Sequence, residues 1–188
     1  VLVDGVNVKN YKFDTLYDKL GYVTQKAVLF AGSVRENVFF GESGAPETDE
    51  ELKNAIELSK AEEFVDKLPD GTEHMISQMG RNVSGGQKQR LSIARALSRK
   101  PEILVFDDSF SALDYKTDAK LREGLNEKLK DTTKIIVAQR ISTIRHADKI
   151  IVLDRGEAVG MGTHEELMKN CDVYKEIALS QLSAAELA

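Results

Sequence analysis

Residues 82–114, NVSGGQKQRLSIARALSRKPEILVFDDSFSALD, contain the pattern that most constrains the fold. Ser84 to Gln87 is a small, flexible turn, and the residues after it have the spacing of an amphipathic helix. Residues 103–107, ILVFD, form an unbroken apolar run, which is typical of a strand buried on both faces of a parallel sheet. Strands that alternate with helices in this way predict an α/β sheet with right-handed crossovers.

The flanking sequence continues this alternation. Val1 to Val8 alternates as a strand with a turn signal at Asp4-Gly5. Between Ser33 and Arg99 the pattern is mostly helical with no convincing strand, so we expect a helical insertion between two strands of the sheet. Further strands are predicted at residues 20–25 and 134–138 and as a hairpin of 149–153 with 158–162.

Helix starts are predicted from capping residues. A serine or threonine followed three residues later by glutamate is the pattern of a reciprocal capping box. Three pairs of this kind are expected to start helices, Ser33 with Glu36, Thr48 with Glu51 and Thr163 with Glu166. Two aspartates, Asp114 and Asp172, are also expected to cap helices.

Composition excludes several classes of protein. With 26 Lys and Arg against 31 Asp and Glu, the net charge is -5, which argues against general binding to nucleic acid or to a membrane surface. The single cysteine, Cys171, cannot form an internal disulfide, and no cluster has the spacing of metal ligands. No apolar run approaches the roughly 18 residues of a spanning helix. We therefore expect a cytosolic chain, with any membrane part elsewhere.

Two places have residues suited to phosphate and magnesium chemistry. The turn at Ser84 to Gln87 opens a helix, whose free N–H groups and dipole favour an anion, although a serine-capped turn is the simpler alternative. Asp107 ends a buried strand at the carboxyl edge of the sheet, where α/β proteins bind ligands. A carboxylate there suits Mg²⁺ held through water beside phosphates, and a capping role is the alternative.

Taken together, the motifs resemble those of the ATP-binding cassette (ABC) ATPases. The run SGGQ resembles the signature motif, ILVFD the Walker B strand and Ser111 to Asp114 the D-loop, while LGYVTQ resembles the Q-loop. The resemblance implies a partial P-loop NTPase-like fold, with ATP and Mg²⁺ as cofactors. It assigns ATP or Mg²⁺ binding to Gln25, Ser84, Gly85, Gly86, Gln87, Asp107 and Asp114, of which Gln25 and Asp107 contact the metal.

The resemblance also implies an organisation and partners. Residues 1–33 and 100–188 would form the ATPase core, and residues 34–99 the helical subdomain that carries the signature. AVLFAGSVRENVFFG, residues 27–41, resembles the exporter form of the surface that meets the transmembrane domains. A second nucleotide-binding domain would complete the sites at the cytoplasmic face of the membrane.

The sequence departs from the family pattern in three ways. No G-x-x-x-x-G-K-S/T occurs, so we expect a nucleotide-binding domain cut at its N-terminus that binds ATP poorly and exposes apolar surface. Asp108 stands where the family has its catalytic glutamate, and Gln139 where it has the switch histidine. These changes predict a degenerate catalytic site, as in one half of a heterodimeric exporter.

Two alternatives remain open from sequence. One is a soluble ABC ATPase of DNA repair or translation, against which the exporter-like segment and the acidic charge argue. The other is a non-catalytic fragment that serves only as a dimerisation surface, which the missing Walker A motif favours.

Overall fold

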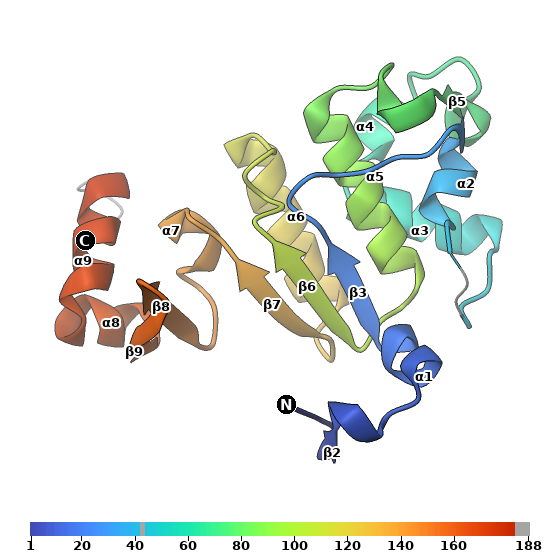
Figure 1. Cartoon of the computed structure of the whole chain (residues 1–188). Helices are drawn as coiled ribbons and strands as arrows, with labels where there is room; N and C mark the ends of the chain where they lie inside the picture. Colours follow the sequence, from blue (N-terminus) through green and yellow to red (C-terminus); the bar gives the residue numbers. More distant parts are fainter. Residues whose placement is uncertain (42–43, 183–188) are drawn as a thin grey trace. The chain divides into compact units, whose positions relative to one another are not determined.

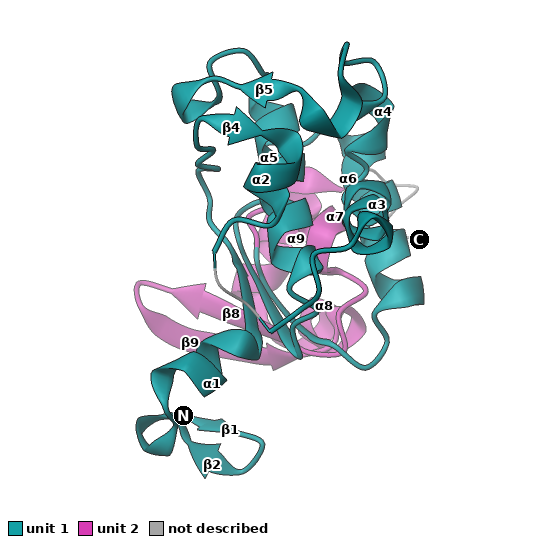
Figure 2. Cartoon of the chain, turned by 90° about the vertical axis from the view of Figure 1, so that its right-hand side faces the viewer, with its two compact units in different colours: residues 1–137 teal, residues 138–188 magenta. Residues whose placement is uncertain are grey.

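The computed structural model describes residues 1–41 and 44–182. The chain divides into two compact units, Val1–Val137 and Ala138–Ala188. Figure 1 shows the elements and Figure 2 the two units.

The first unit is built around a parallel sheet of three strands in the order β3-β6-β7 (Figure 1). The strands are β3 (Leu20–Val23), β6 (Ile103–Asp107) and β7 (Thr133–Val137). The central strand is the apolar run ILVFD, as the sequence predicts. The mixed α/β fold with a parallel sheet is therefore confirmed.

The two faces of this sheet differ in exposure because successive side chains of a strand point to opposite sides. Leu104 and Phe106 of β6 are fully buried against the helices. On the other face, Tyr22, Ile135 and Val137 are 55%, 50% and 52% exposed. This face of the sheet therefore carries exposed apolar side chains.

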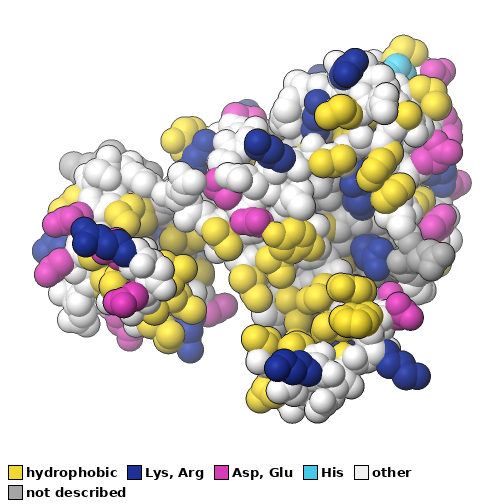
Figure 3. Space-filling model, viewed as in Figure 1, with side chains coloured by type: hydrophobic (Ala, Val, Ile, Leu, Met, Phe, Trp, Pro, Cys, Tyr) yellow, Lys and Arg dark blue, Asp and Glu magenta, His cyan; other side chains and the backbone are white. Residues whose placement is uncertain are grey.

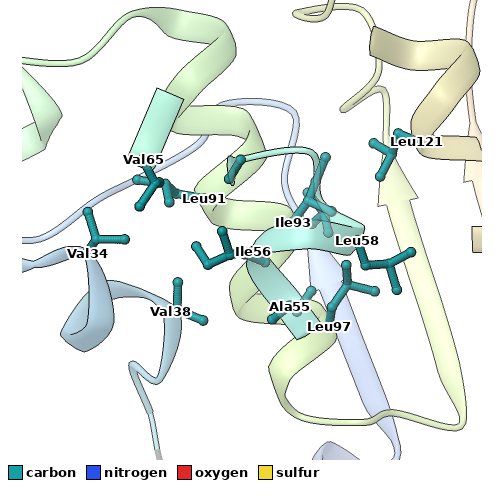
Figure 4. Close-up of a cluster of buried hydrophobic side chains, with 14 of the residues drawn as sticks. Val34, Val38, Ala55, Ile56, Leu58, Val65, Leu91, Ile93, Leu97 and Leu121 are labelled. Carbon is teal, nitrogen blue, oxygen red and sulfur yellow. The ribbon is translucent and has the colours of Figure 1, made fainter. Parts of the chain in front are cut away.

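The segment between β3 and β6 is largely helical, and its helices form one core with those that follow (Figure 4). The buried side chains of this core come from several helices and include Val34 and Val38 of one helix and Ile56, Leu91 and Leu121 of three others. The helices of the unit are α1 (Phe13–Asp18), α2 (Val34–Val38), α3 (Asp49–Leu58), α4 (Glu62–Val65), α5 (Gly85–Ser98) and α6 (Tyr115–Lys128).

The first unit also contains two antiparallel pairs of two-residue strands that the sequence patterns did not predict as such. The insertion contains β5 (Met75–Ile76), which pairs antiparallel with β4 (Gly32–Ser33), so the prediction of no strand there was wrong. A two-residue strand is too short to produce a periodic pattern. At the N-terminus, the predicted turn lies in a hairpin of β1 (Leu2–Val3) and β2 (Val6–Asn7) rather than in one long strand.

The predicted capping boxes at Ser33 and Thr163 are confirmed, because each hydroxyl accepts from a backbone N–H and each glutamate accepts in return. At Thr48 only half of the box forms. The Glu51 carboxylate instead forms an ion pair with Lys100 Nζ at 2.5 Å. An ammonium group attracts a carboxylate more strongly than a neutral backbone N–H does.

In its described residues, 138–182, the second unit is an antiparallel hairpin with three helices. Its elements are α7 (Ile141–Ile144), β8 (Ile150–Asp154), β9 (Glu157–Gly162), α8 (His164–Asn170) and α9 (Asp172–Gln181). The predicted hairpin is confirmed. The predicted cap at Asp172 is wrong, because α9 begins at this residue and Cys171 takes the cap position without a side-chain bond. In the described part of the chain, no helix is both long and apolar enough to cross a membrane.

Candidate functional site

Three of the predicted site residues meet at the carboxyl ends of β3 and β6. Gln25 follows β3, while Asp107 ends β6 and Asp108 comes directly after it. Gln25 Nε2 donates a hydrogen bond to Asp108 Oδ2 at 3.1 Å. Because the two strands are parallel neighbours, residues more than eighty positions apart in sequence come into contact at one edge of the sheet.

Tyr22 is a further site residue that the sequence motifs did not indicate. Its hydroxyl donates to Asp107 Oδ2 at 2.8 Å, and this bond to the carboxylate raises the pKa of Tyr22 above its ordinary value. The register pairs Tyr22 with Val105, two residues before Asp107. Only the strand order reveals this contact, and no sequence pattern supplies that order.

Asp108 has an unusual backbone conformation. Its φ of 44° lies in the left-handed region, where aspartate is tolerated better than most residues. Its N–H donates to the Val137 carbonyl oxygen at 2.9 Å, and its carbonyl oxygen accepts from the Ser111 hydroxyl at 2.7 Å. Neighbouring elements thus hold Asp108 in a sparsely populated conformation, a feature that clusters at functional sites.

The turn at Ser84 to Gln87 opens α5 with a complete capping box. The Ser84 hydroxyl accepts from the Gln87 N–H at 3.3 Å, and Gln87 Oε1 accepts from the Ser84 N–H at 2.8 Å. Ser84 and Gly85 are exposed. The structural alternative of a serine-capped turn is therefore present, and the same turn presents the positive end of a 14-residue helix to solvent.

The segment from Ser111 to Asp114 lies against this turn. A Cβ atom on Gly86 would lie 3.5 Å from the Ala112 carbonyl oxygen. Asp114 caps α6, as predicted: Oδ1 accepts from the Thr117 N–H at 3.0 Å and Oδ2 from its hydroxyl at 2.7 Å. The bond from the Thr117 N–H is the main cause of the lowered pKa of Asp114.

Gln139 belongs to the second unit and is exposed. Gln181 on α9 holds the backbone around it: Gln181 Nε2 donates to the Gln139 carbonyl oxygen, and Gln181 Oε1 accepts from the Ile141 N–H, both at 2.9 Å. The side chain of Gln181 therefore fixes the backbone next to the predicted switch position.

The residues at the sheet edge fit a magnesium ion that is shared with phosphate. Asp107, Asp108 and Gln25 supply carboxylate and amide oxygens, the ligand type that Mg²⁺ prefers. No group of three or more His, Cys, Asp or Glu suited to a metal occurs among residues 1–41 and 44–182. Magnesium bound through one or two carboxylates and substrate phosphates does not need such a group.

At this edge of the sheet Tyr22 and Gln25 have exposed side chains, and Asp107 and Asp108 are half-buried. Two cavities, of about 390 Å³ and 440 Å³, lie elsewhere in the first unit. One is lined by residues of α3 and of the C-terminal ends of α5 and α6, and the other by residues of α2, α3 and α4.

A second surface gathers apolar side chains around Arg95 of α5. Phe30 and Phe40 stack with ring centroids 4.0 Å apart, and the Arg95 guanidinium lies 5.4 Å from each ring centroid. Val28, Phe30 and Phe40 are 54%, 41% and 49% exposed. Figure 3 shows exposed hydrophobic side chains over the region of α5 and α2.

Comparison with known proteins identifies the family. The model of the family described as ABC transporter matches residues 1–111. The chain belongs to this family.

Relatives of this ABC transporter chain extend the match to nearly all of its length. An uncharacterised ABC transporter ATP-binding protein of Mycobacterium tuberculosis is 46% identical over 188 residues, covering 98% of the chain and 32% of the relative. A Staphylococcus aureus protein, named as a multidrug export ATP-binding/permease protein, is 41% identical over 177 residues, covering 94% and 30%. The chain thus spans about a third of the length of these relatives.

A solved structure agrees with the fold. The structure of a bacterial Atm1-family ABC exporter with ATP bound matches with a TM-score of 0.89 and 34% identity, covering 95% of this chain and 31% of that one.

Proposed function

We propose that this chain is the nucleotide-binding part of an exporter-type ABC transporter, in which ATP binding and hydrolysis drive a substrate across a membrane. The observation that carries the proposal is the meeting of Gln25, Asp107 and Asp108 at the carboxyl edge of the sheet. The Atm1-family exporter and the multidrug export relative support the transport role.

Each residue at this edge has a role in the proposal. The Asp107 carboxylate and the Gln25 amide oxygen are the groups that would hold Mg²⁺ beside the phosphates of ATP. When bound, the ion neutralises charge on the β- and γ-phosphates of ATP. Tyr22 fixes the Asp107 carboxylate by donating to one of its oxygens. The protein's contribution is then positioning and electrostatic stabilisation.

Asp108 is the proposed weak point of this site. Asp108 stands at the position of the family's catalytic glutamate, but its side chain is shorter by one methylene. The carboxylate is therefore withdrawn by about 1–1.5 Å. Gln139, at the switch position, can donate a hydrogen bond to the γ-phosphate but cannot exchange a proton near neutral pH. The two changes together make this a slow site.

The exposed turn at Ser84 to Gln87 serves a different ATP molecule. ABC sites form across a head-to-tail dimer, so this turn completes the site of a second nucleotide-binding domain. Asp114, whose carboxylate accepts a hydrogen bond from the Thr117 N–H, lies in the segment that contacts the turn. An intact signature beside a weakened catalytic position supports a heterodimer in which the partner's site does most of the hydrolysis.

The apolar surface around Arg95 is the proposed docking site for the transmembrane domains. Residues 27–41 contain the two exposed phenylalanines of this surface, Phe30 and Phe40, and this segment has the exporter form. Docking there places the chain at the cytoplasmic face of the membrane. Nucleic acid is not among the proposed partners, in keeping with the net charge of -5.

ATP hydrolysis by the full-length protein with its partner in lipid vesicles tests the proposal. We expect magnesium-dependent hydrolysis that a transported substrate stimulates, and weaker ATP binding at this site in Asp107→Asn. The matched control, Asp131→Asn on an exposed turn, leaves ATP binding unchanged. Stimulation by nucleic acid instead of membrane reconstitution would support a soluble ABC ATPase, and absence of hydrolysis would support a dimerisation fragment.

A further inference from the structure

A buried glutamine links the helix that begins at the signature turn to the loop that carries Gln25. Gln89 lies on α5, five residues after the capping residue Ser84. Its side chain is 1% exposed, and Nε2 donates to the Thr24 carbonyl oxygen at 3.1 Å. A buried amide that loses its partner is costly, so this bond is a strong constraint on where Thr24 lies.

Thr24 directly precedes Gln25, and the Thr24 hydroxyl holds the residue that follows Gln25. Thr24 Oγ1 donates to the Lys26 carbonyl oxygen at 2.8 Å, so backbone carbonyls on both sides of Gln25 accept hydrogen bonds. Gln25 itself is exposed and contacts Asp108. The loop belongs to no helix or strand, so these side-chain bonds are what hold it.

The same helix holds the loop at its far end. Arg95, six residues beyond Gln89, donates from Nη1 to the Val28 carbonyl oxygen at 2.9 Å. The segment from Thr24 to Val28 is therefore attached to α5 at two points, and the attachment nearest Gln25 is the one made by Gln89.

We propose that Gln89 is a positioning residue that sets the place of Gln25 relative to the signature turn. This inference rests on the proposed function, in which Ser84 to Gln87 contact the partner's ATP and Gln25 contacts magnesium at this chain's own site. A shift of α5 when the turn engages the partner's nucleotide moves Thr24 through the Gln89 amide. The occupancy of one ATP site thereby adjusts the metal ligand of the other.

NMR relaxation of the full 188-residue chain tests the positioning step without nucleotide. Gln89→Met keeps the length of the side chain and removes the donor. We expect the backbone order parameters of Thr24 to Lys26 to fall from about 0.85 toward 0.6, while those of α5 stay near 0.85. The matched control is Ser98→Ala, which removes a buried bond from the same helix to the Val38 carbonyl oxygen and leaves the loop unchanged.

Gln89→Glu provides a second, reversible variant. A carboxylate cannot donate to the Thr24 carbonyl oxygen, but its protonated form can, so the order parameters should recover as the pH is lowered. Unchanged loop order in Gln89→Met, or no pH dependence in Gln89→Glu, would overturn the proposal.

The consequence for the metal is measured in the assembled transporter. Gln89→Met should raise the magnesium concentration at half-maximal hydrolysis by this chain's own site roughly fivefold, in line with one lost hydrogen bond. Single-turnover hydrolysis with the partner's site inactivated isolates this site. An unchanged magnesium dependence would contradict the link to Gln25. If the unsubstituted protein hydrolyses no ATP, the proposed function fails, and the NMR result still decides the role of Gln89.

Discussion

The Gln25 side-chain amide donates to the Asp108 carboxylate across 3.1 Å, joining the loop after β3 to the residue after β6. The Gln25 nitrogen faces Asp108, so its amide oxygen is the atom that can turn to a cation. Val137 and Ser111 fix the Asp108 backbone. The short side chain therefore cannot advance toward a substrate by a shift of its backbone.

Lengthening this side chain should strengthen the site. In the assembled transporter, Asp108→Glu combined with Gln139→His should raise hydrolysis at this site on the order of 100-fold, because a misplacement of about 1 Å costs that much. Single-turnover hydrolysis with the partner's site inactivated measures this. Asp108→Asn with Gln139→His is the control, and an equal rise in that variant would show that carboxylate position is not the cause.

The bond between Tyr22 and Asp107 predicts a pH dependence. The folded protein holds the Tyr22 pKa above its ordinary value of 10.0, so the neutral hydroxyl contributes stability below pH 10.0. That contribution is lost as the pH rises through the raised pKa. Subtracting the ultraviolet absorbance of Tyr22→Phe from that of the unsubstituted chain isolates the ionisation of Tyr22. The midpoint of this difference should lie above pH 10.0. Asp107→Asn should lower this midpoint, and an unchanged midpoint would rule out the carboxylate as its cause.

Arg95 should not tolerate replacement by lysine. Its guanidinium donates to the Asn37 and Val28 carbonyl oxygens and to Asn37 Oδ1, at 2.7, 2.9 and 3.1 Å. Burial lowers the pKa of Arg95 to about 10, which leaves it charged at neutral pH. A lysine has one nitrogen and cannot reach all three acceptors, so Arg95→Lys should lower the free energy of unfolding by about 1–3 kcal/mol.

Denaturant unfolding measures this loss. Arg81→Lys, at an exposed position, is the control and should stay within about 0.5 kcal/mol of the unsubstituted chain. Equal stability of the two variants would show that the Arg95 contacts contribute nothing.

The core shared by α6 and the inserted helices should depend on Leu121, which is fully buried. Leu121→Ala should lower the free energy of unfolding by about 2–5 kcal/mol through lost burial and a cavity. Leu2→Ala, at a side chain 65% exposed, should cost less than about 0.5 kcal/mol. Similar losses in both variants would mean that Leu121 does not belong to the cooperative core.

The long apolar runs and the capping pairs made much of the fold predictable from sequence. ILVFD became the central strand, and the serine and threonine caps at Ser33 and Thr163 formed because each depends on residues only three apart. The β4–β5 pair was missed since two-residue strands depend on a distant partner rather than on a local pattern. Asp172 failed as a cap because the preceding residue already had the extended backbone that a cap needs.

The site residues likewise fall into those that a local sequence motif predicts and those that only the fold reveals. Residues in motifs could be named from sequence, and the strand register brings Gln25 to Asp108. Tyr22 and Gln89 could not be named, because their roles arise from contacts across the sheet and between α5 and the loop. Such contacts depend on strand order and helix packing, which no short motif encodes.

We propose above all that this chain completes its partner's ATP site through Ser84 to Gln87 while its own catalytic position, Asp108, is weak. ATP hydrolysis by the assembled heterodimer, measured with each domain's catalytic carboxylate removed in turn, tests it most directly. We predict that removing the partner's glutamate reduces hydrolysis to background, whereas Asp108→Asn lowers it only slightly. A fall to background in Asp108→Asn would contradict the claim and show that this site is catalytic.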